Sequence, residues 1–326
     1  ICARIGVASK SSIRKSERII PDDKMLIQFS LNVCYSVVIP PSRHSRLKSD
    51  FRRDILKILW ELFECLPQRV KSRETDDNEL CILHEKVDTL YRHLIVFDIC
   101  STWYSTEREP VHMAVLRDIE AEDSQNEKIE HWASILSSVC KEFITRLGKD
   151  QLTGSQTDHN GLILDFVSDF SELHQFCFAS EVNVASILER HIVQKLLTLH
   201  RFHYLRDLLL KINPEWLPKV IVQSNIHAFV KDAMMAMAEH GSETSSKAGS
   251  RSPGEMIHGA IQCQDIIGPL FPDLASDFRS MRRYLDAANF IRNMLHCGGS
   301  SPSQSSEGFN LNLDTFNASH PLDIIE

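Results

Sequence analysis

Histidine and cysteine are the residues most able to do chemistry in this sequence of 326 residues, which holds 15 His and 9 Cys. His200 and His203 stand three residues apart, as do His174 and Cys177, and two ligands on one helix face can begin a zinc site. Such a site needs four protein ligands, or three and a water, and no second pair of matching spacing or HExxH motif lies nearby. The spacing therefore favours partly exposed surface histidines and predicts no metal site.

The cysteines are scattered through the chain without a CxxC pair, and most stand beside Leu, Ile, Phe or Val. They are Cys2, Cys34, Cys65, Cys81, Cys100, Cys140, Cys177, Cys263 and Cys297. This pattern is typical of reduced thiols that serve as small apolar core residues. Sequence spacing cannot show whether a Cys and a His come together in the folded chain to form a nucleophile pair. None of these cysteines, however, lies on a Gly-rich loop that would expose a thiolate.

Paired carboxylates are the remaining candidates for acid–base chemistry. Asp76-Asp77 and Glu122-Asp123 stand in polar loops, where nothing is expected to shift their pKa for catalysis. The sequence also lacks GxSxG, a Walker A loop and a GxGxxG motif after a strand. We therefore predict a protein that is not an enzyme, with no catalytic, cofactor-binding or metal-ligating residues and no cofactor.

Large apolar side chains are expected in the core. The four tryptophans fall on apolar faces or helix ends, which favours core packing over a ligand cage: Trp60, Trp103, Trp132 and Trp216. Met234, Met235 and Met237 lie on one predicted helix, where soft side chains could serve a partner's groove; core packing is the default interpretation.

The net charge of −8 conceals an uneven distribution. Residues 1–73 carry 15 Lys and Arg against 7 Asp and Glu, whereas the remainder carries 21 against 37. The basic end could meet phosphates or an anionic membrane surface. A solvated, partly disordered flank is favoured, because no aromatic residues interleave with the charges as they do in a single-strand binding groove.

No membrane-spanning segment or signal peptide is predicted. The longest apolar runs fall far short of the roughly 20 residues that a spanning helix needs. The basic N-terminal stretch has neither a continuous apolar core nor a small-residue cleavage site. Together with the reduced cysteines, these features predict a cytoplasmic location.

From Asp50 onward, apolar residues recur every three and four positions, which predicts one amphipathic helix after another. The first is ended by Pro67, and the second spans about Leu80–Phe97 with one packed face and one charged face. Earlier, Met25–Ile39 alternates loosely like a strand before Pro40-Pro41. Further helices are expected at about 127–147, 162–178, 183–200, 203–212, 215–240, 254–268 and 274–296.

This succession predicts an all-α fold in which antiparallel helices stack into an irregular α-solenoid, since no strict repeat period is visible. We expect three regions. The pattern does not decide the structure of residues 1–50, which are either disordered or the tail of a preceding domain. Residues 51–296 are predicted to form the helical domain. Residues 297–326 are predicted to be a linker and the start of a further helical segment. Because the chain begins at Ile1 and stops within an apolar stretch, a fragment of a larger protein is expected.

Several segments resemble one known family. Residues 63–69 (Phe-Glu-Cys-Leu-Pro-Gln-Arg), 83–90 and 92–94 look like the opening of the helical domain in the NBAS (neuroblastoma-amplified sequence) family, with its Cys-Leu-Pro and Val-Asp-x-Leu-x-x-His-Leu patterns. Glu109-Pro110-Val111 resembles the family's Lys-Pro-Ile turn, with Glu in place of Lys. Weaker similarity to the closing helices and the stretch after them covers 233–246, 252–253, 260–267, 283–295 and 320–324. Arg282-Arg283 depart from the family's usual Glu, and residues 1–50 match nothing.

The resemblance implies a non-catalytic α-solenoid subunit of the NRZ (yeast Dsl-type) tethering complex, which engages SNAREs on the endoplasmic reticulum and captures Golgi-derived retrograde vesicles. Its implied partners are other tethering subunits and reticulum SNAREs, through which the protein associates peripherally with that membrane. No direct nucleic-acid partner and no small-molecule substrate are expected. A kinetochore-type helical scaffold, and a factor linked to nonsense-mediated mRNA decay, are the alternatives.

Overall fold

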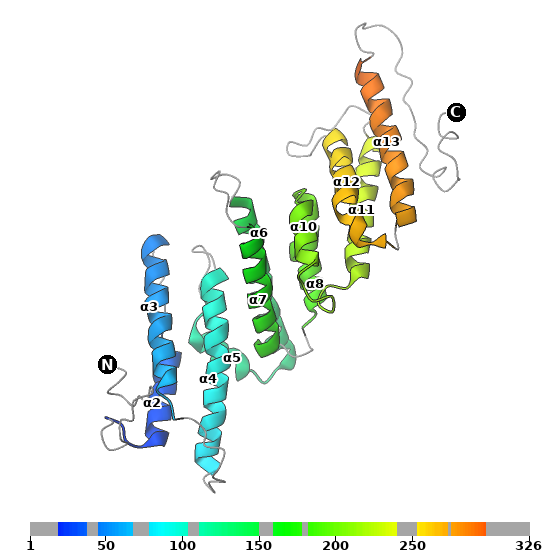
Figure 1. Cartoon of the computed structure of the whole chain (residues 1–326). Coiled ribbons are helices and arrows are strands. Elements are labelled where there is room, and N and C mark those ends of the chain that lie inside the picture. Colours follow the sequence, from blue (N-terminus) through cyan, green and yellow to red (C-terminus); the bar gives the residue numbers. More distant parts are fainter. Residues whose placement is uncertain are drawn as a thin grey trace. The chain divides into compact units, whose positions relative to one another are not determined.

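The computed structural model describes residues 19–37, 45–67, 78–103, 111–149, 159–177, 182–239, 253–272 and 275–297 (Figure 1). Every regular element within these ranges is a helix and none is a strand, which confirms the predicted all-α class. The chain divides into two compact units, residues 1–183 and 184–326. Each unit is described by itself.

The described residues of the first unit form four long helices and two shorter ones. They are α2 (Asp23–Ser36), α3 (Ser45–Glu64), α4 (Asn78–Trp103), α5 (Met113–Glu120), α6 (Gln125–Lys149) and α7 (His159–Cys177). The helices predicted from Asp50, from Leu80 and at about 127–147 and 162–178 are confirmed as α3, α4, α6 and α7. The eight-residue helix α5 was not predicted.

The strand-like interpretation of Met25–Ile39 is wrong, because residues 23–36 form helix α2. The Asp22 carboxylate caps it by accepting a hydrogen bond from the Met25 amide at 2.8 Å. The helix buries one face and packs against α4 and α5, which makes it part of the first unit's core. The buried residues recur at helical spacing: Leu26, Ile27, Ser30, Leu31 and Cys34.

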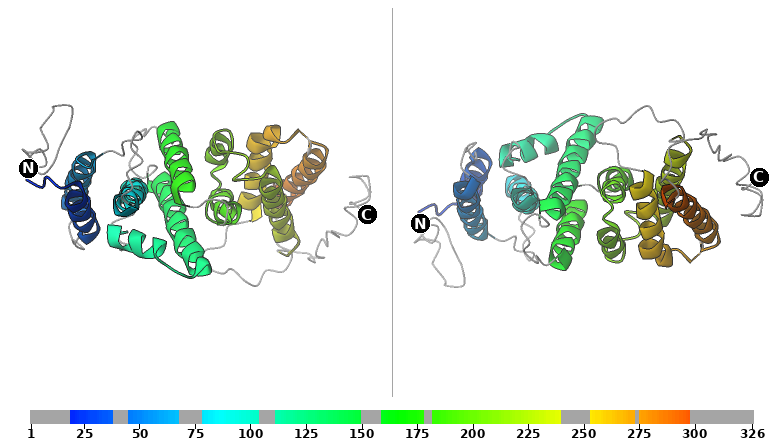
Figure 2. Two further views of the ribbon diagram at one scale, coloured as in Figure 1. Left: turned by 90° about the horizontal axis from the view of Figure 1, so that it is seen from below. Right: turned by 90° about the horizontal axis from the view of Figure 1, so that it is seen from above.

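Helix α4 is the central element of the first unit. It contacts each of the other five helices, and the views show it between α3 and α7 (Figures 1 and 2). The prediction of one packed and one charged face holds for its first half, where Leu83, Val87 and Leu90 are buried and the charged side chains face outward. In the second half, His93–Phe97 is buried without interruption, as expected of a helix that is covered on several sides.

An aromatic cluster joins α4 to α6 and α7. The Phe143 and Phe166 rings stack with centroids 4.1 Å apart, and the Trp103 ring meets both of them edge-on at 6.2 and 5.8 Å. All three side chains are fully buried. Offset-stacked and edge-to-face pairs of this kind add about 0.5–1.5 kcal/mol beyond the area they bury.

The second unit begins with a helix that changes its winding along its length. Residues 184–198 form α8 (Val184–Leu188), a π-helical turn η2 (Glu189–Val193) and α9 (Gln194–Thr198), in place of the single helix predicted at 183–200. There follow α10 (Phe202–Leu209), α11 (Lys219–Glu239), α12 (Pro253–Ile267), the 3₁₀ turn η3 (Gly268–Leu270) and α13 (Ala275–Cys297), close to the predicted bounds. Helix α12 packs against α10, α11 and α13.

The turn after α9 brings His200 against a glycine of α12. Arg201 N–H donates to the Leu196 carbonyl at 2.8 Å and His200 N–H to the Leu197 carbonyl at 3.0 Å, the pair of bonds that closes a helix with a left-handed residue. His200 accordingly has φ 56°. A Cβ at Gly259 would stand 2.3 Å from the His200 ring, so the close approach requires glycine.

None of the described helices combines the length and apolar character that crossing a bilayer requires. The segments outside the described part of the chain include residues 1–18, 38–44, 68–77, 104–110, 150–158, 178–181 and 273–274. They also include residues 240–252 and 298–326, the last of which holds all but the first residue of the predicted C-terminal linker.

We predict that Gly259→Ala destabilises the second unit by about 1–2 kcal/mol, since a core clash costs more than the roughly 1 kcal/mol by which Ala favours a helix. In a His200→Gly background, which suits the positive φ and removes the ring, the same change should stabilise the unit by about 1 kcal/mol. Urea unfolding of the four members of this double-mutant cycle measures the reversal. An equal effect of Gly259→Ala in both backgrounds would contradict the contact.

Candidate functional site

The histidine pairs singled out in the sequence do not converge on a metal site. His203 is exposed on α10 and His200 is half-buried in the preceding turn, stacked on the Phe202 ring. His174 is half-buried on α7, and the side chain of Cys177 lies outside the described residues. In the described part of the chain, no three His, Cys, Asp or Glu side chains are arranged to hold a metal ion.

The described cysteines pack as predicted. None of the six forms a disulfide, and five of them are buried: Cys34, Cys65, Cys100, Cys140 and Cys263. Burial raises the pKa of the Cys34 and Cys263 thiols to about 12, and it also raises the pKa values of Cys100 and Cys140. These four thiols therefore stay protonated at neutral pH and are poor nucleophiles.

The other candidates are separated from one another. Glu122 and Asp123 lie in the turn between α5 and α6, as predicted, whereas Asp76 and Asp77 lie outside the described residues.

Met234 is buried in the core, Met235 is exposed, and the side chain of Met237 is not among those described. Trp103 and Trp132 are buried, which confirms the core prediction for both, and Trp216 is half-buried. Trp60 differs, because it is half-buried and lines a pocket.

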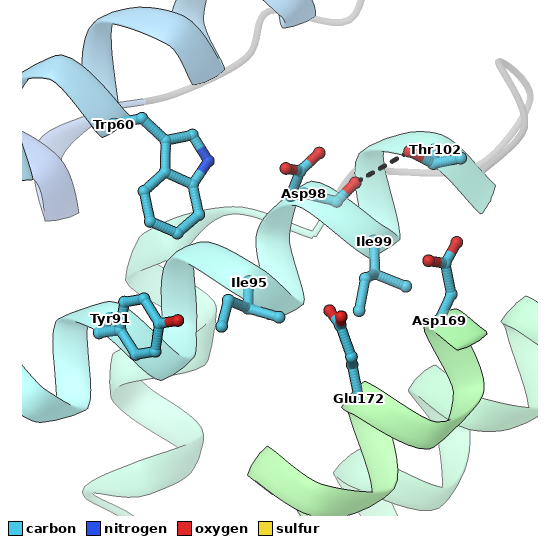
Figure 3. Close-up of a pocket in the computed structure, with 8 residues that line it drawn as sticks. All are labelled: Trp60, Tyr91, Ile95, Asp98, Ile99, Thr102, Asp169 and Glu172. Carbon is cyan, nitrogen blue, oxygen red and sulfur yellow. Dashed lines mark hydrogen bonds between the residues drawn. The ribbon is translucent and has the colours of Figure 1, made fainter. Parts of the chain in front are cut away.

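This pocket, of about 320 Å³, lies where α3, α4 and α7 meet (Figure 3). Helix α4 forms its floor with residues on one face, at spacings of four, three or four residues along the chain: Tyr91, Ile95, Asp98, Ile99 and Thr102. Trp60 stands over it from α3, and Asp169 and Glu172 reach it from α7. The pocket thus combines two aromatic rings, an apolar floor and three carboxylates.

Tryptophan side chains accompany two of the carboxylates. Trp103 Nε1 donates to Asp169 Oδ2 at 2.6 Å, which joins α4 to α7 across 66 residues of sequence. Trp60 of α3 and Asp98 of α4 line the same pocket, and the indole lowers the pKa of Asp98 by favouring its charged form. The Trp103 bond satisfies a buried indole N–H that would otherwise lack a partner, and it holds Asp169 in place.

Burial raises the pKa of both aspartates, since a charged carboxylate is poorly solvated there. The hydrogen bond from Trp60 partly opposes this rise at Asp98, and that from Trp103 does so at Asp169. The negative charges of Glu172, Asp165 and Asp98 raise the pKa of Asp169 further. The pocket therefore holds mutually repelling negative charges.

A guanidinium group already lies beside this site. The Arg146 guanidinium stands 4.8 Å from the centroid of the Trp103 ring and donates a hydrogen bond to the Thr102 carbonyl. Its Nε also lies 3.4 Å from Glu142 on the same helix, so this cation is shared between an aromatic face and a carboxylate outside the pocket.

Helix α4 contains a second polar contact within the core. His93 is 4% exposed, and its Nδ1 lies 2.9 Å from the Tyr35 hydroxyl on α2. Burial, assisted by the neighbouring Arg92 charge, lowers the pKa of His93 to about 4. His93 is therefore neutral in the folded protein at neutral pH.

No protein-family model matches the chain, and no curated protein or solved structure shows significant similarity to it. The resemblance to the NBAS family stays a prediction.

We predict that Asp169→Ala destabilises the first unit by about 1–3 kcal/mol, because it leaves the buried Trp103 N–H without an acceptor. Asp169→Asn keeps an acceptor oxygen and removes a carboxylate that is poorly solvated, as its raised pKa indicates. The stability of this variant at pH 7 should therefore equal or exceed that of the wild type. Urea unfolding followed by tryptophan fluorescence distinguishes the two. Equal losses in both variants would show that charge, and not the hydrogen bond, matters at this position.

We also predict a loss of stability in acid through His93. Because its folded pKa of about 4 lies below the ordinary 6.5, the unfolded chain binds a proton first, and the stabilisation present above pH 6.5 is lost as pH falls toward 4. Between pH 7.5 and 5 the wild type should lose about 2 kcal/mol more than His93→Gln, which cannot titrate. The comparison cancels the contributions of other groups. Parallel pH profiles of the two proteins would contradict the assignment.

Proposed function

We propose that this chain is a non-catalytic scaffold subunit of an endoplasmic-reticulum vesicle-tethering complex, acting in Golgi-to-ER retrograde transport by binding other proteins. In this proposal its helices stack as an irregular α-solenoid. Its partners are other tethering subunits and reticulum SNAREs. The protein is cytoplasmic and associates with the membrane through those partners. It uses no cofactor and no small-molecule substrate.

The observation that carries this proposal is the all-helical architecture. Long helices lie around α4 in the first unit and around α12 in the second, and the described ranges contain no strand. Arrays of packed helices extend a chain and present long surfaces to partner helices, which is what a tether requires. The resemblance of residues 63–69, 83–90 and 92–94 to the NBAS family supports the more specific role.

Some apolar side chains lie on outer faces, where a partner can bury them. Met25 and Phe29, four residues apart on α2, are 67% and 43% exposed, and Val220 at the start of α11 is 72% exposed. Exposed apolar residues occur singly on most proteins, so these positions support protein binding only together with the architecture.

The tagged full chain, purified from cells after mild crosslinking, is expected to bring down tethering subunits and reticulum SNAREs. Leu136→Asp places a charge in the core of α6, where the wild-type side chain is fully buried, and should abolish this co-purification by unfolding the first unit. Ser134→Asp adds the same charge at an exposed position of the same helix and should leave it intact. A wild-type chain that purifies alone, or one that decorates mitotic chromosomes in place of the reticulum, would overturn the proposal.

A further inference from the structure

We propose that the pocket between α3, α4 and α7 binds the arginine side chain of a protein partner. The inference rests on the proposed protein-binding function and deepens it, since it assigns one site and one kind of contact.

Charge is the first argument. Asp98, Asp169 and Glu172 all line the pocket, and no lining residue is basic. Within the described ranges, none of these three carboxylates forms an ion pair with a Lys or Arg side chain. The Arg146 guanidinium, which donates to the carbonyl of the pocket residue Thr102, also contacts the Trp103 ring and Glu142. Among the described residues, the three carboxylates therefore lack a basic partner, and a cation would complement their charge.

The aromatic walls are the second argument, since acidic residues alone do not define a ligand. The Trp60 and Tyr91 rings meet edge-on with centroids 6.0 Å apart, and Tyr91 is 41% exposed at the rim. The floor between these rings and the carboxylates is the apolar surface of Ile95 and Ile99 (Figure 3). An aliphatic stem can lie on that floor, while a cationic head lies against aromatic faces and carboxylates.

The arrangement suits an extended organic cation and not a metal ion. No three acidic side chains in the described part of the chain are close enough to share a metal ion. The Asp169 carboxylate is held by the Trp103 indole N–H, which fixes its orientation and leaves its remaining lone pairs for a second donor. A planar guanidinium has five N–H donors spread over its edge and can therefore reach separated acceptors.

Arginine is preferred over lysine for the same reasons. Guanidinium stacks on aromatic rings and binds carboxylates through two parallel bonds, whereas an ammonium group is a compact and strongly hydrated charge. The protein itself places the Arg146 guanidinium on the Trp103 ring beside this site. The volume of about 320 Å³ is at the small end of ligand pockets, which suits one side chain.

The tripeptide amide acetyl-Ala-Arg-Ala-NH₂ is the probe for the test, titrated into the ¹⁵N-labelled full chain. The four tryptophans give four indole N–H signals, of which Trp60 and Trp103 report on the pocket and Trp216, in the second unit, is the reference. We expect saturable shifts of the Trp60 and Trp103 signals with the arginine peptide. The lysine peptide should bind more weakly, and the citrulline peptide, a neutral isostere of arginine, should not bind.

Glu172→Gln removes one exposed carboxylate of the pocket and should weaken binding about two- to fivefold, the range expected of an exposed ion pair. Glu130→Gln makes the same change on an exposed position of α6 and should leave the affinity unchanged. Unaltered indole spectra of both apo-variants show that each remains folded.

Four results would overturn the proposal: no saturable shift, equal binding of the citrulline or lysine peptide, equal affinity in Glu172→Gln, or tighter binding of free arginine than of the peptide. The last would identify a free amino acid as the ligand. Each of these leaves co-purification with tethering subunits intact, so the failure of the pocket can be told apart from the failure of the scaffold function.

Discussion

The burial of most of the second half of α4 is the constraint on which the first unit depends. Five helices pack around α4, and between His93 and Trp103 only Asp98, Ser101 and Thr102 are not buried. A polar group left unsatisfied in the buried part would cost roughly 1–3 kcal/mol. The Ser101 and Thr102 hydroxyls donate to carbonyls of α4 itself, whereas His93 contacts Tyr35 of α2 and the Trp103 N–H donates to Asp169 of α7. These last two contacts help to determine how the helices meet.

Most of the helices could be predicted from the sequence because each buries a single face. The regular three- and four-residue spacing from Phe51 onward identified α3, α4, α6 and α7 and the helices of the second unit. Helix α2 was missed because Met25 and Phe29 are apolar yet face solvent, so they obscured the spacing of its buried residues. Helix α5 spans barely two turns, too few for a period to be recognised, and the π turn at Glu189–Val193 has no pattern of its own.

The pocket could be predicted only in part. Tyr91, Ile95, Asp98 and Thr102 lie on one face of a helix, and a carboxylate within the apolar run 94–100 is a sign of an unusual environment. Nothing in the sequence connects Asp98 with Trp60, or Trp103 with a residue 66 positions away, since those contacts exist only once three helices have packed. The default assignment of Trp60 to the core therefore failed, because a half-buried indole at a helix junction has the same sequence neighbours as a fully buried one.

The same charges that define the pocket also reduce the stability of the unit that contains it. Asp169 is ionised less readily than an ordinary carboxylate because it is desolvated and because Glu172, Asp165 and Asp98 repel its charge. A core of apolar residues alone would avoid that cost. The Trp103 hydrogen bond offsets only part of this electrostatic cost. A cation that binds beside these carboxylates would attract their charges and so stabilise the folded state. By linkage, such a ligand stabilises the first unit in proportion to its affinity for the folded state, and binding to this pocket is thereby coupled to the order of α3, α4 and α7.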